Sequence, residues 1–215
     1  MDAPTYRIIP SWYPPIQLFE SLVDPERLDA AYALESMTND RLRDEVGEIA
    51  LVPPEDRVVG PGTSPIMAAF THIGVASRFT DGSFGVYYAG LSFETAVAES
   101  MHSQRRRMED TEEPPRQLTM RCFRCAVTAD LVDARGIADL HTPDSWTAGQ
   151  AFGRDCRERS EFGIHYRSVR YDGGESVAIL RPPALIPPAV QTRHLAYHWD
   201  GKRFTGFSYM QEGQL

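Results

Sequence analysis

ASRFTDGSFGVYYAG occupies residues 76–90 and is followed by LSFETAVAES at residues 91–100. The first part contains a polar, glycine-punctuated turn at residues 77–85. Residues 86–89 then form a short run with the β-branched and aromatic composition of a strand. Ser92 is a residue type that caps helices, and we predict a helix from there to about residue 107. The segment therefore predicts a turn, a strand and a helix in immediate succession.

On both sides of this segment, predicted strands and helices are mixed without regular alternation. Residues 5–9 are predicted as a strand, and a helix begins near Asp24, a capping residue followed by Pro25 at the first helical position. A further helix is predicted within residues 142–159, with strands at 117–127, 131–133, 162–171, 176–181, 192–199 and 203–207. This mixture indicates an α+β fold with a mixed β-sheet core.

The composition is that of one compact domain. The chain has 215 residues, of which 42% are hydrophobic and 24% charged, so it can bury a core without disulfides. Residues 52–64 are rich in proline and glycine, but apolar segments resume on both sides, so we expect a loop inside a single domain spanning residues 1–215. The low, odd cysteine count and the absence of a secretion signal predict a cytoplasmic protein. No apolar run approaches the roughly 20 residues that cross a bilayer, so we expect no contact with a membrane.

The charge balance disfavours nucleic acid as a direct partner. The formal net charge is −8, and a polyanion would be repelled by the average surface. Lys202 is the only lysine among the 22 basic residues. Arginine pairs with phosphate or carboxylate at two points, although biased codon usage explains the excess equally well. Arg105, Arg106 and Arg107 lie at a predicted helix end, where cations complement the helix dipole, and a structural role suffices for them.

Common catalytic and metal-binding patterns are absent. Cys122 and Cys125 have the spacing of a zinc half-site, but no second pair exists and the two positions face opposite sides of a predicted strand. Ser168 lacks the flanking glycines of a nucleophile elbow, and no phosphate loop or dinucleotide fingerprint occurs. We therefore expect no metal site.

Arg78, Tyr88 and Glu99, all within residues 76–100, indicate a functional site only when they are considered as a set. Taken singly, Arg78, Tyr88 and Glu99 look like surface residues, and the helical periodicity places Glu99 well off the centre of the apolar face. Tyr88 follows Arg78 by ten residues and Glu99 follows it by 21, a spacing that resembles the RES-domain family of bacterial toxins. That family is named for an arginine, a glutamate and a serine. Ser168, within GIHYRSVR at residues 163–170, resembles the family serine.

The resemblance extends over nearly the whole chain. Tyr6-Arg7 is similar to the opening strand of the family, and HLAYHWDG at residues 194–201 is similar to the end of its longer members. Two features depart from the family pattern. Phe79 and Thr80 stand where many members have tryptophan and asparagine, and a predicted helical insertion at about residues 11–74 separates the opening strand from the arginine turn. We expect that insertion to cover the site or to serve as a contact surface.

The resemblance implies a fold like that of ADP-ribosyltransferases, with NAD+ as a consumed substrate and no separate cofactor. In this reading Arg78 and Arg7 clamp the pyrophosphate and Tyr88 stacks against nicotinamide. Glu99 holds the ribose hydroxyls and opposes the positive charge that develops at the anomeric carbon. Ser168, expected on the strand face of residues 164, 166 and 170, positions a phosphate or the incoming nucleophile.

Several activities remain open at this stage. Transfer of the ribosyl group to water gives a glycohydrolase, transfer to phosphate gives a phosphorylase, and transfer to a side chain gives a mono-ADP-ribosyltransferase. The resemblance favours NAD+ depletion by one of the first two routes. A catalytically silent nucleotide-binding module is a further alternative. The family also implies a protein partner, an antitoxin with a helix-turn-helix region of the Xre type.

Overall fold

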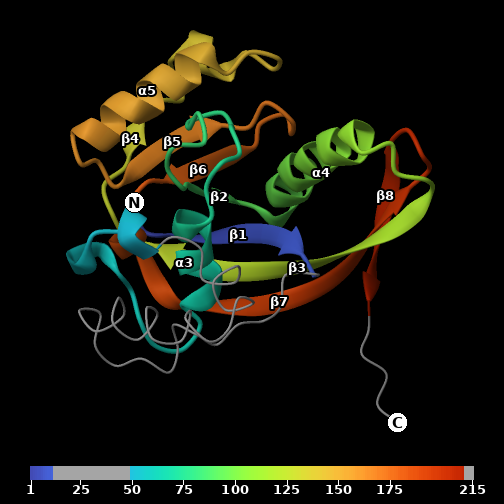
Figure 1. Ribbon diagram of the computed structural model, residues 1–215, viewed down its shortest axis with the longest axis horizontal. Helices are drawn as coiled ribbons and strands as arrows, with labels where there is room; N and C mark the ends of the chain where they lie inside the picture. Colours follow the sequence, from blue (N-terminus) through green and yellow to red (C-terminus); the bar gives the residue numbers. More distant parts are fainter. Residues whose placement is uncertain (12–48, 211–215) are drawn as a thin grey trace.

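The computed structural model describes residues 1–11 and 49–210 of the chain (Figure 1). The helix predicted to begin near Asp24, and residues 12–48 of the predicted insertion, lie outside the described residues. Among the described helices, none is long and apolar enough to cross a membrane.

One eight-stranded sheet forms the centre of the described fold, with the strand order β4-β5-β6-β2-β1-β3-β7-β8. β4 and β5 are parallel, and the other neighbouring strands are antiparallel. The structure thus confirms the predicted α+β class and the mixed sheet. The strands are β1 (Ala3–Pro10), β2 (Tyr87–Gly90), β3 (Arg116–Val127), β4 (Val132–Asp133), β5 (Gly163–Arg167), β6 (Glu175–Ile179), β7 (Leu185–Trp199) and β8 (Phe204–Met210).

Helices pack on both faces of this sheet. The described α-helices are α3 (Ser64–Thr71), α4 (Phe93–Asp110) and α5 (Thr147–Glu158), and the described 3-10 helices are η2 (Ile49–Leu51), η3 (Pro54–Asp56), η4 (Ala138–His141) and η5 (Pro182–Ala184). In Figure 1, α5 lies at the upper left beside β4 and β5, and α4 lies to the right. The sequence pattern did not predict α3, because six of its eight residues are buried and no polar face marks its helical period.

The alternation of side chains along β3 shows how the two faces are filled. Leu118, Met120 and Cys122 pack with the apolar residues of α4. Cys125 and Val127 join the cluster that contains α3 on the other face. Successive residues of a strand point to opposite sides, so the two cysteines are separated by the sheet as the sequence predicted.

The turn, strand and helix predicted from residues 76–100 are all present. The Ser92 side chain accepts a hydrogen bond from the Thr95 backbone N–H at 3.1 Å and caps α4. Gly90 ends β2 close to this cap, where a Cβ atom would lie 2.6 Å from the Ala96 nitrogen. The missing side chain therefore lets α4 start directly against the end of the strand.

The end of β5 and the start of β7 differ most from the predicted strand boundaries. β5 stops at Arg167 instead of residue 171, because the Ser168 hydroxyl accepts hydrogen bonds from the backbone N–H groups of Arg170 and Tyr171 and turns the chain. β7 begins at Leu185, earlier than the predicted residue 192, and stays paired with β3 through a register shift between Arg124 and Ala126.

α5 lies against the arginine turn through its glycines. A Cβ atom at Gly153 would collide with the Phe79 carbonyl oxygen, and one at Gly149 would collide with the Arg78 carbonyl oxygen. These two positions therefore set how closely the helix approaches the turn that carries Arg78.

We predict that Gly153→Ala destabilises the protein by about 1–3 kcal/mol, the usual cost of overpacking a closely packed contact. Gly136→Ala is the matched control, because no atom lies within 4 Å of a Cβ at that position. Urea unfolding of both variants measures the difference, and equal stability of the two would contradict the packing described for α5.

Candidate active site

A cavity of about 640 Å³ opens between α4, the strands β1 and β2, and the turn at residues 75–78. Four of the five residues singled out from the sequence line it: Arg7, Arg78, Tyr88 and Glu99. The fifth, Ser168, is not a lining residue, but it contacts Glu99 directly. The structure therefore brings together side chains that are up to 161 positions apart in the sequence.

Arg78 is a buried cation in this cavity, with 8% of its surface exposed. Its Nη1 donates to the carbonyl oxygens of Leu140 and Thr142 at 2.7 and 3.1 Å. Within the described part of the chain, no hydrogen bond engages its Nε or Nη2. Since burying a charge without partners is costly, an anion in the cavity would complete the coordination of this guanidinium.

The Tyr88 hydroxyl holds the arginine turn in place. It accepts a hydrogen bond from the Phe79 backbone N–H at 3.0 Å and lies 2.8 Å from the Ser77 hydroxyl. Burial raises the pKa of Tyr88 to about 12, so the phenol stays protonated at neutral pH. The ring of Tyr88 is predicted to contact substrate, and the structure also gives its hydroxyl a positioning role.

Thr80, one of the departures from the family pattern, closes the same turn. Its hydroxyl donates to the Phe84 carbonyl oxygen at 2.8 Å and accepts from the Gly82 N–H at 3.0 Å. The Gln150 side chain adds hydrogen bonds from α5 to the carbonyl oxygens of Ser77 and Thr80. The turn is thus fixed by side chains on its own residues, on β2 and on α5.

Glu99 and Ser168 are joined across the cavity wall. The Ser168 hydroxyl donates to Glu99 Oε1 at 2.6 Å. The Ser168 hydroxyl oxygen also accepts hydrogen bonds from two backbone N–H groups of its own loop. The expectation that Ser168 lies on the strand face of residues 164, 166 and 170 is wrong, because β5 ends at Arg167. Ser168 therefore orients the carboxylate from the loop between β5 and β6.

Arg7 reaches the cavity from β1. Its Nη1 donates to the Tyr88 carbonyl oxygen at 3.1 Å, and its guanidinium lies 4.8 Å from the centre of the Tyr87 ring. These contacts hold a second cation at the cavity lining.

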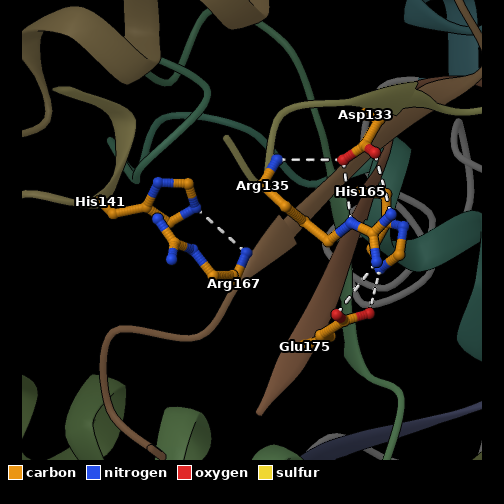
Figure 2. Close-up of polar contacts among 6 residues, drawn as sticks. All are labelled: Asp133, Arg135, His141, His165, Arg167 and Glu175. Atoms are coloured by element: carbon orange, nitrogen blue, oxygen red, sulfur yellow. Dashed lines mark hydrogen bonds and ion pairs between the residues drawn. The ribbon is translucent and has the colours of Figure 1, made fainter. Parts of the chain in front are cut away.

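A short segment around η4 supports the site from outside. Besides the two carbonyl oxygens that bind Arg78, its Pro143 carbonyl oxygen accepts a hydrogen bond from Arg170 Nη2 at 2.6 Å. Figure 2 shows the His141 ring pointing at the Arg167 backbone, whose N–H donates to His141 Nε2 at 3.0 Å. Because that nitrogen accepts, His141 is neutral with its proton on Nδ1. Burial lowers the pKa of His141, in agreement with this state.

Figure 2 also shows a second polar cluster, whose residues do not line the cavity. Arg135 pairs with Asp133 and donates to Glu175 at 3.1 Å, and His165 lies 2.6 Å from the same glutamate. These contacts tie together the neighbouring strands β4, β5 and β6. Among the described residues, no group of three or more histidine, cysteine or acidic side chains is placed to hold a metal ion.

The cavity is cationic although the chain is acidic. Its lining contains five arginines and two carboxylates: Arg7, Arg78, Arg106, Arg107, Arg170, Glu99 and Asp110. Such a local excess attracts an anionic ligand regardless of the net charge of −8. The charge-based expectation for the average surface therefore does not apply to the site itself.

Several lining residues were not predicted from the sequence. Arg106 was assigned to the helix dipole, and Trp146, His102 and Arg170 received no role. A signal for two of them was present, because His102 and Arg106 follow Glu99 by three and seven residues, the spacing of one helical face. Trp146 gave no comparable signal, since it precedes a helix that starts far away in the sequence.

A family model described as the RES domain matches residues 54–200. The match covers more than half of the chain, and the chain therefore belongs to the RES domain family. Arg78, Tyr88, Glu99 and Ser168 lie within the matched region, whereas Arg7 precedes it.

Two further comparisons cover most of the chain. The chain is 28% identical over 210 residues to "Uncharacterized protein y4oC" of Sinorhizobium fredii (strain NBRC 101917 / NGR234), covering 93% of this chain and 84% of that protein. A solved structure, the crystal structure of the M. tuberculosis MbcT-MbcA toxin-antitoxin complex, aligns with a TM-score of 0.48 and 11% identity over 98% of this chain and 85% of the other.

His102 gives the site a measurable titration. Burial, assisted by the neighbouring cations Arg170, Arg105 and Arg106, lowers the pKa of His102 to about 4. The folded protein therefore resists protonation of this ring, whereas the unfolded chain takes up the proton near the ordinary value of about 6.5.

We predict that this histidine lowers stability as the pH falls from about 6.5 to about 4, because only the unfolded state binds the proton over that range. His102→Gln removes the titration, so its free energy of unfolding should fall less steeply between pH 7 and pH 5 than that of the wild type. The control is His72→Gln, at an exposed position outside the cavity lining. Identical pH profiles for wild type and His102→Gln would contradict the prediction.

Proposed function

We propose that this protein is a toxin that consumes NAD+ by cleaving the bond between nicotinamide and ribose. The observation that carries the proposal is the convergence of Glu99, Arg78, Arg7 and Tyr88 on one cavity of about 640 Å³, with Ser168 bonded to the glutamate. The volume lies in the range of roughly 300–1,000 Å³ that suits small ligands. Membership of the RES domain family supports the assignment, because the resemblance of these residues implied the same chemistry.

A single carboxylate suffices for this cleavage. Nicotinamide carries a positive charge in NAD+ and departs neutral, so no acid has to protonate it, in contrast to the paired carboxylates of ordinary glycosidases. Positive charge then develops at the anomeric carbon, and the Glu99 carboxylate opposes it. The Ser168 hydroxyl holds one Glu99 oxygen at 2.6 Å and leaves the other oxygen for the ribose.

The arginines would bind the phosphates of the dinucleotide. Arg78 Nη1 already donates to two carbonyl oxygens, and these hydrogen bonds fix the plane of the guanidinium before a ligand binds. A planar, fixed cation loses little freedom when it binds an oxyanion, and each charge-assisted hydrogen bond contributes about 1.5–3 kcal/mol. Arg7 supplies a second cation from β1, and the ring of Tyr88 contributes an apolar wall beside them.

Each possible acceptor gives a different product, so product analysis distinguishes among them. Water attacking the anomeric carbon yields ADP-ribose, nicotinamide and a proton. Inorganic phosphate yields the 1-phosphate of ADP-ribose, and a protein side chain yields an ADP-ribosylated target. We favour water or phosphate, and label transferred from NAD+ to cell-extract proteins would identify the mono-ADP-ribosyltransferase alternative. Tight NAD+ binding without nicotinamide release would identify a silent binding module.

We predict that Glu99→Gln lowers kcat for nicotinamide release by about 100-fold or more, because the amide cannot oppose the developing charge. Ser168→Ala should also lower kcat, by a smaller factor, since it frees the Glu99 carboxylate from its partner. Glu94→Gln serves as the control, because Glu94 is an exposed residue of the same helix outside the cavity lining. Chromatographic quantification of nicotinamide measures all three rates.

Full turnover by Glu99→Gln would refute the assignment of that carboxylate. Inactivity of the wild type with every acceptor would refute the proposed function itself. Thermal unfolding of each variant shows whether a loss of activity results from misfolding.

We further propose that an antitoxin with a helix-turn-helix region of the Xre type is the protein partner. The family resemblance supports this proposal, and access to the cavity is what such a partner would block. Expression of the chain alone is predicted to arrest bacterial growth, and co-expression of an adjoining antitoxin frame to restore it. Unaffected growth with confirmed expression of the chain would contradict a toxic function.

A further inference from the structure

One face of α4 runs along the cavity beyond Glu99. Arg106 follows Glu99 by seven residues, which is two helical turns or about 10 Å along the axis. Both residues line the cavity, and so does Trp146, which directly precedes α5. The cavity therefore has a second end, set apart from the carboxylate and built by a cation and an indole.

Arg106 and Trp146 form a stacked pair at this end. The guanidinium carbon of Arg106 lies 4.3 Å from the centre of the Trp146 ring. Such pairs present flat, polarisable surfaces, and nucleic-acid bases stack on both arginine and tryptophan. Arg106 lies on α4 and Trp146 directly precedes α5, so the two side chains meet only in the folded chain.

Trp146 differs from a tryptophan placed for packing. Trp199 is buried, with 4% of its surface exposed, and its Nε1 donates to the Glu113 carbonyl oxygen at 2.9 Å. Trp146 is half-buried, and it belongs to none of the hydrophobic clusters formed by the described residues. Within that part of the chain, its Nε1 has no hydrogen-bond partner. An indole with an apolar face and an available donor in a cavity is suited to a heteroaromatic ligand.

We propose that Arg106 and Trp146 form the subsite for a purine base, the adenine of the dinucleotide, at the end of the cavity opposite the reacting ribose. This inference rests on the proposed function for the identity of the dinucleotide. Its geometry follows from the cavity: Glu99 takes the nicotinamide ribose, and Arg78 and Arg170 lie on the wall available to the phosphates. The two helical turns between Glu99 and Arg106 separate the two halves of the ligand.

The test compares two substrates with the same reacting bond, NAD+ and nicotinamide mononucleotide, which lacks the adenylate half. Trp146→Ala is expected to raise KM for NAD+ about tenfold, which corresponds to about 1.4 kcal/mol of lost stacking, and to leave kcat near the wild-type value. Its kcat/KM for the mononucleotide should stay within about twofold of wild type. Trp146→Phe keeps a stacking ring and should restore most of the NAD+ affinity.

Arg106→Ala is expected to raise KM for NAD+ by about threefold, the loss of one stacking partner. Arg105→Ala is the matched control, since Arg105 is the preceding arginine on α4, pairs with Glu109 and does not line the cavity. It should leave both substrates unaffected. Equal loss of activity toward NAD+ and the mononucleotide in Trp146→Ala would overturn the subsite, because a general structural role acts on both.

Calorimetry separates this subsite from the proposed function. ADP should bind the wild type and bind Trp146→Ala about tenfold more weakly, whereas inorganic pyrophosphate should bind both equally. That result supports the base subsite even if the wild type cleaves no NAD+, an outcome that would refute only the proposed function. No binding of ADP to the wild type, or equal affinity of both proteins for ADP, overturns the subsite.

Discussion

Burial of the Arg78 guanidinium is the constraint on which the described site depends. A cation with 8% of its surface exposed needs hydrogen-bond acceptors, and the carbonyl oxygens of residues 140 and 142 accept from its Nη1. The turn that carries Arg78 must therefore be rigid. The Tyr88 hydroxyl, the Thr80 hydroxyl and the close contact with α5 do this. These contacts together hold the positive charge of Arg78 at the cavity wall.

The opposite charge is placed by an independent part of the fold. Glu99 is delivered by α4, whose start is fixed by the Ser92 cap and whose apolar face packs on the sheet. Ser168 then orients the carboxylate from the loop after β5. Among the ion pairs of the described residues, none joins Arg78 to Glu99. Both side chains line the cavity, where they can meet a ligand with complementary charges.

The sequence predicted the elements that local signals encode. The Ser92 cap and the strand at β2 were readable because they depend on near neighbours. Residue spacing alone placed Glu99 away from the apolar face, and only the family resemblance suggested a site. The family resemblance gave Ser168 a positioning role, but its contact with Glu99 could not be predicted, since the hydroxyl that ends β5 meets a helix 69 residues away. No sequence pattern predicted Trp146 as a lining residue either, because a cavity wall assembled from distant segments leaves no periodic pattern.

The most direct measurement is a crystal structure of the protein with a carbocyclic analogue of NAD+ whose nicotinamide bond cannot be cleaved. The ribose hydroxyls next to nicotinamide are expected within hydrogen-bonding distance of the Glu99 carboxylate, with a phosphate oxygen on Arg78. An analogue bound elsewhere on the protein, or bound in the cavity with Glu99 turned away from the ribose, would contradict the proposed chemistry.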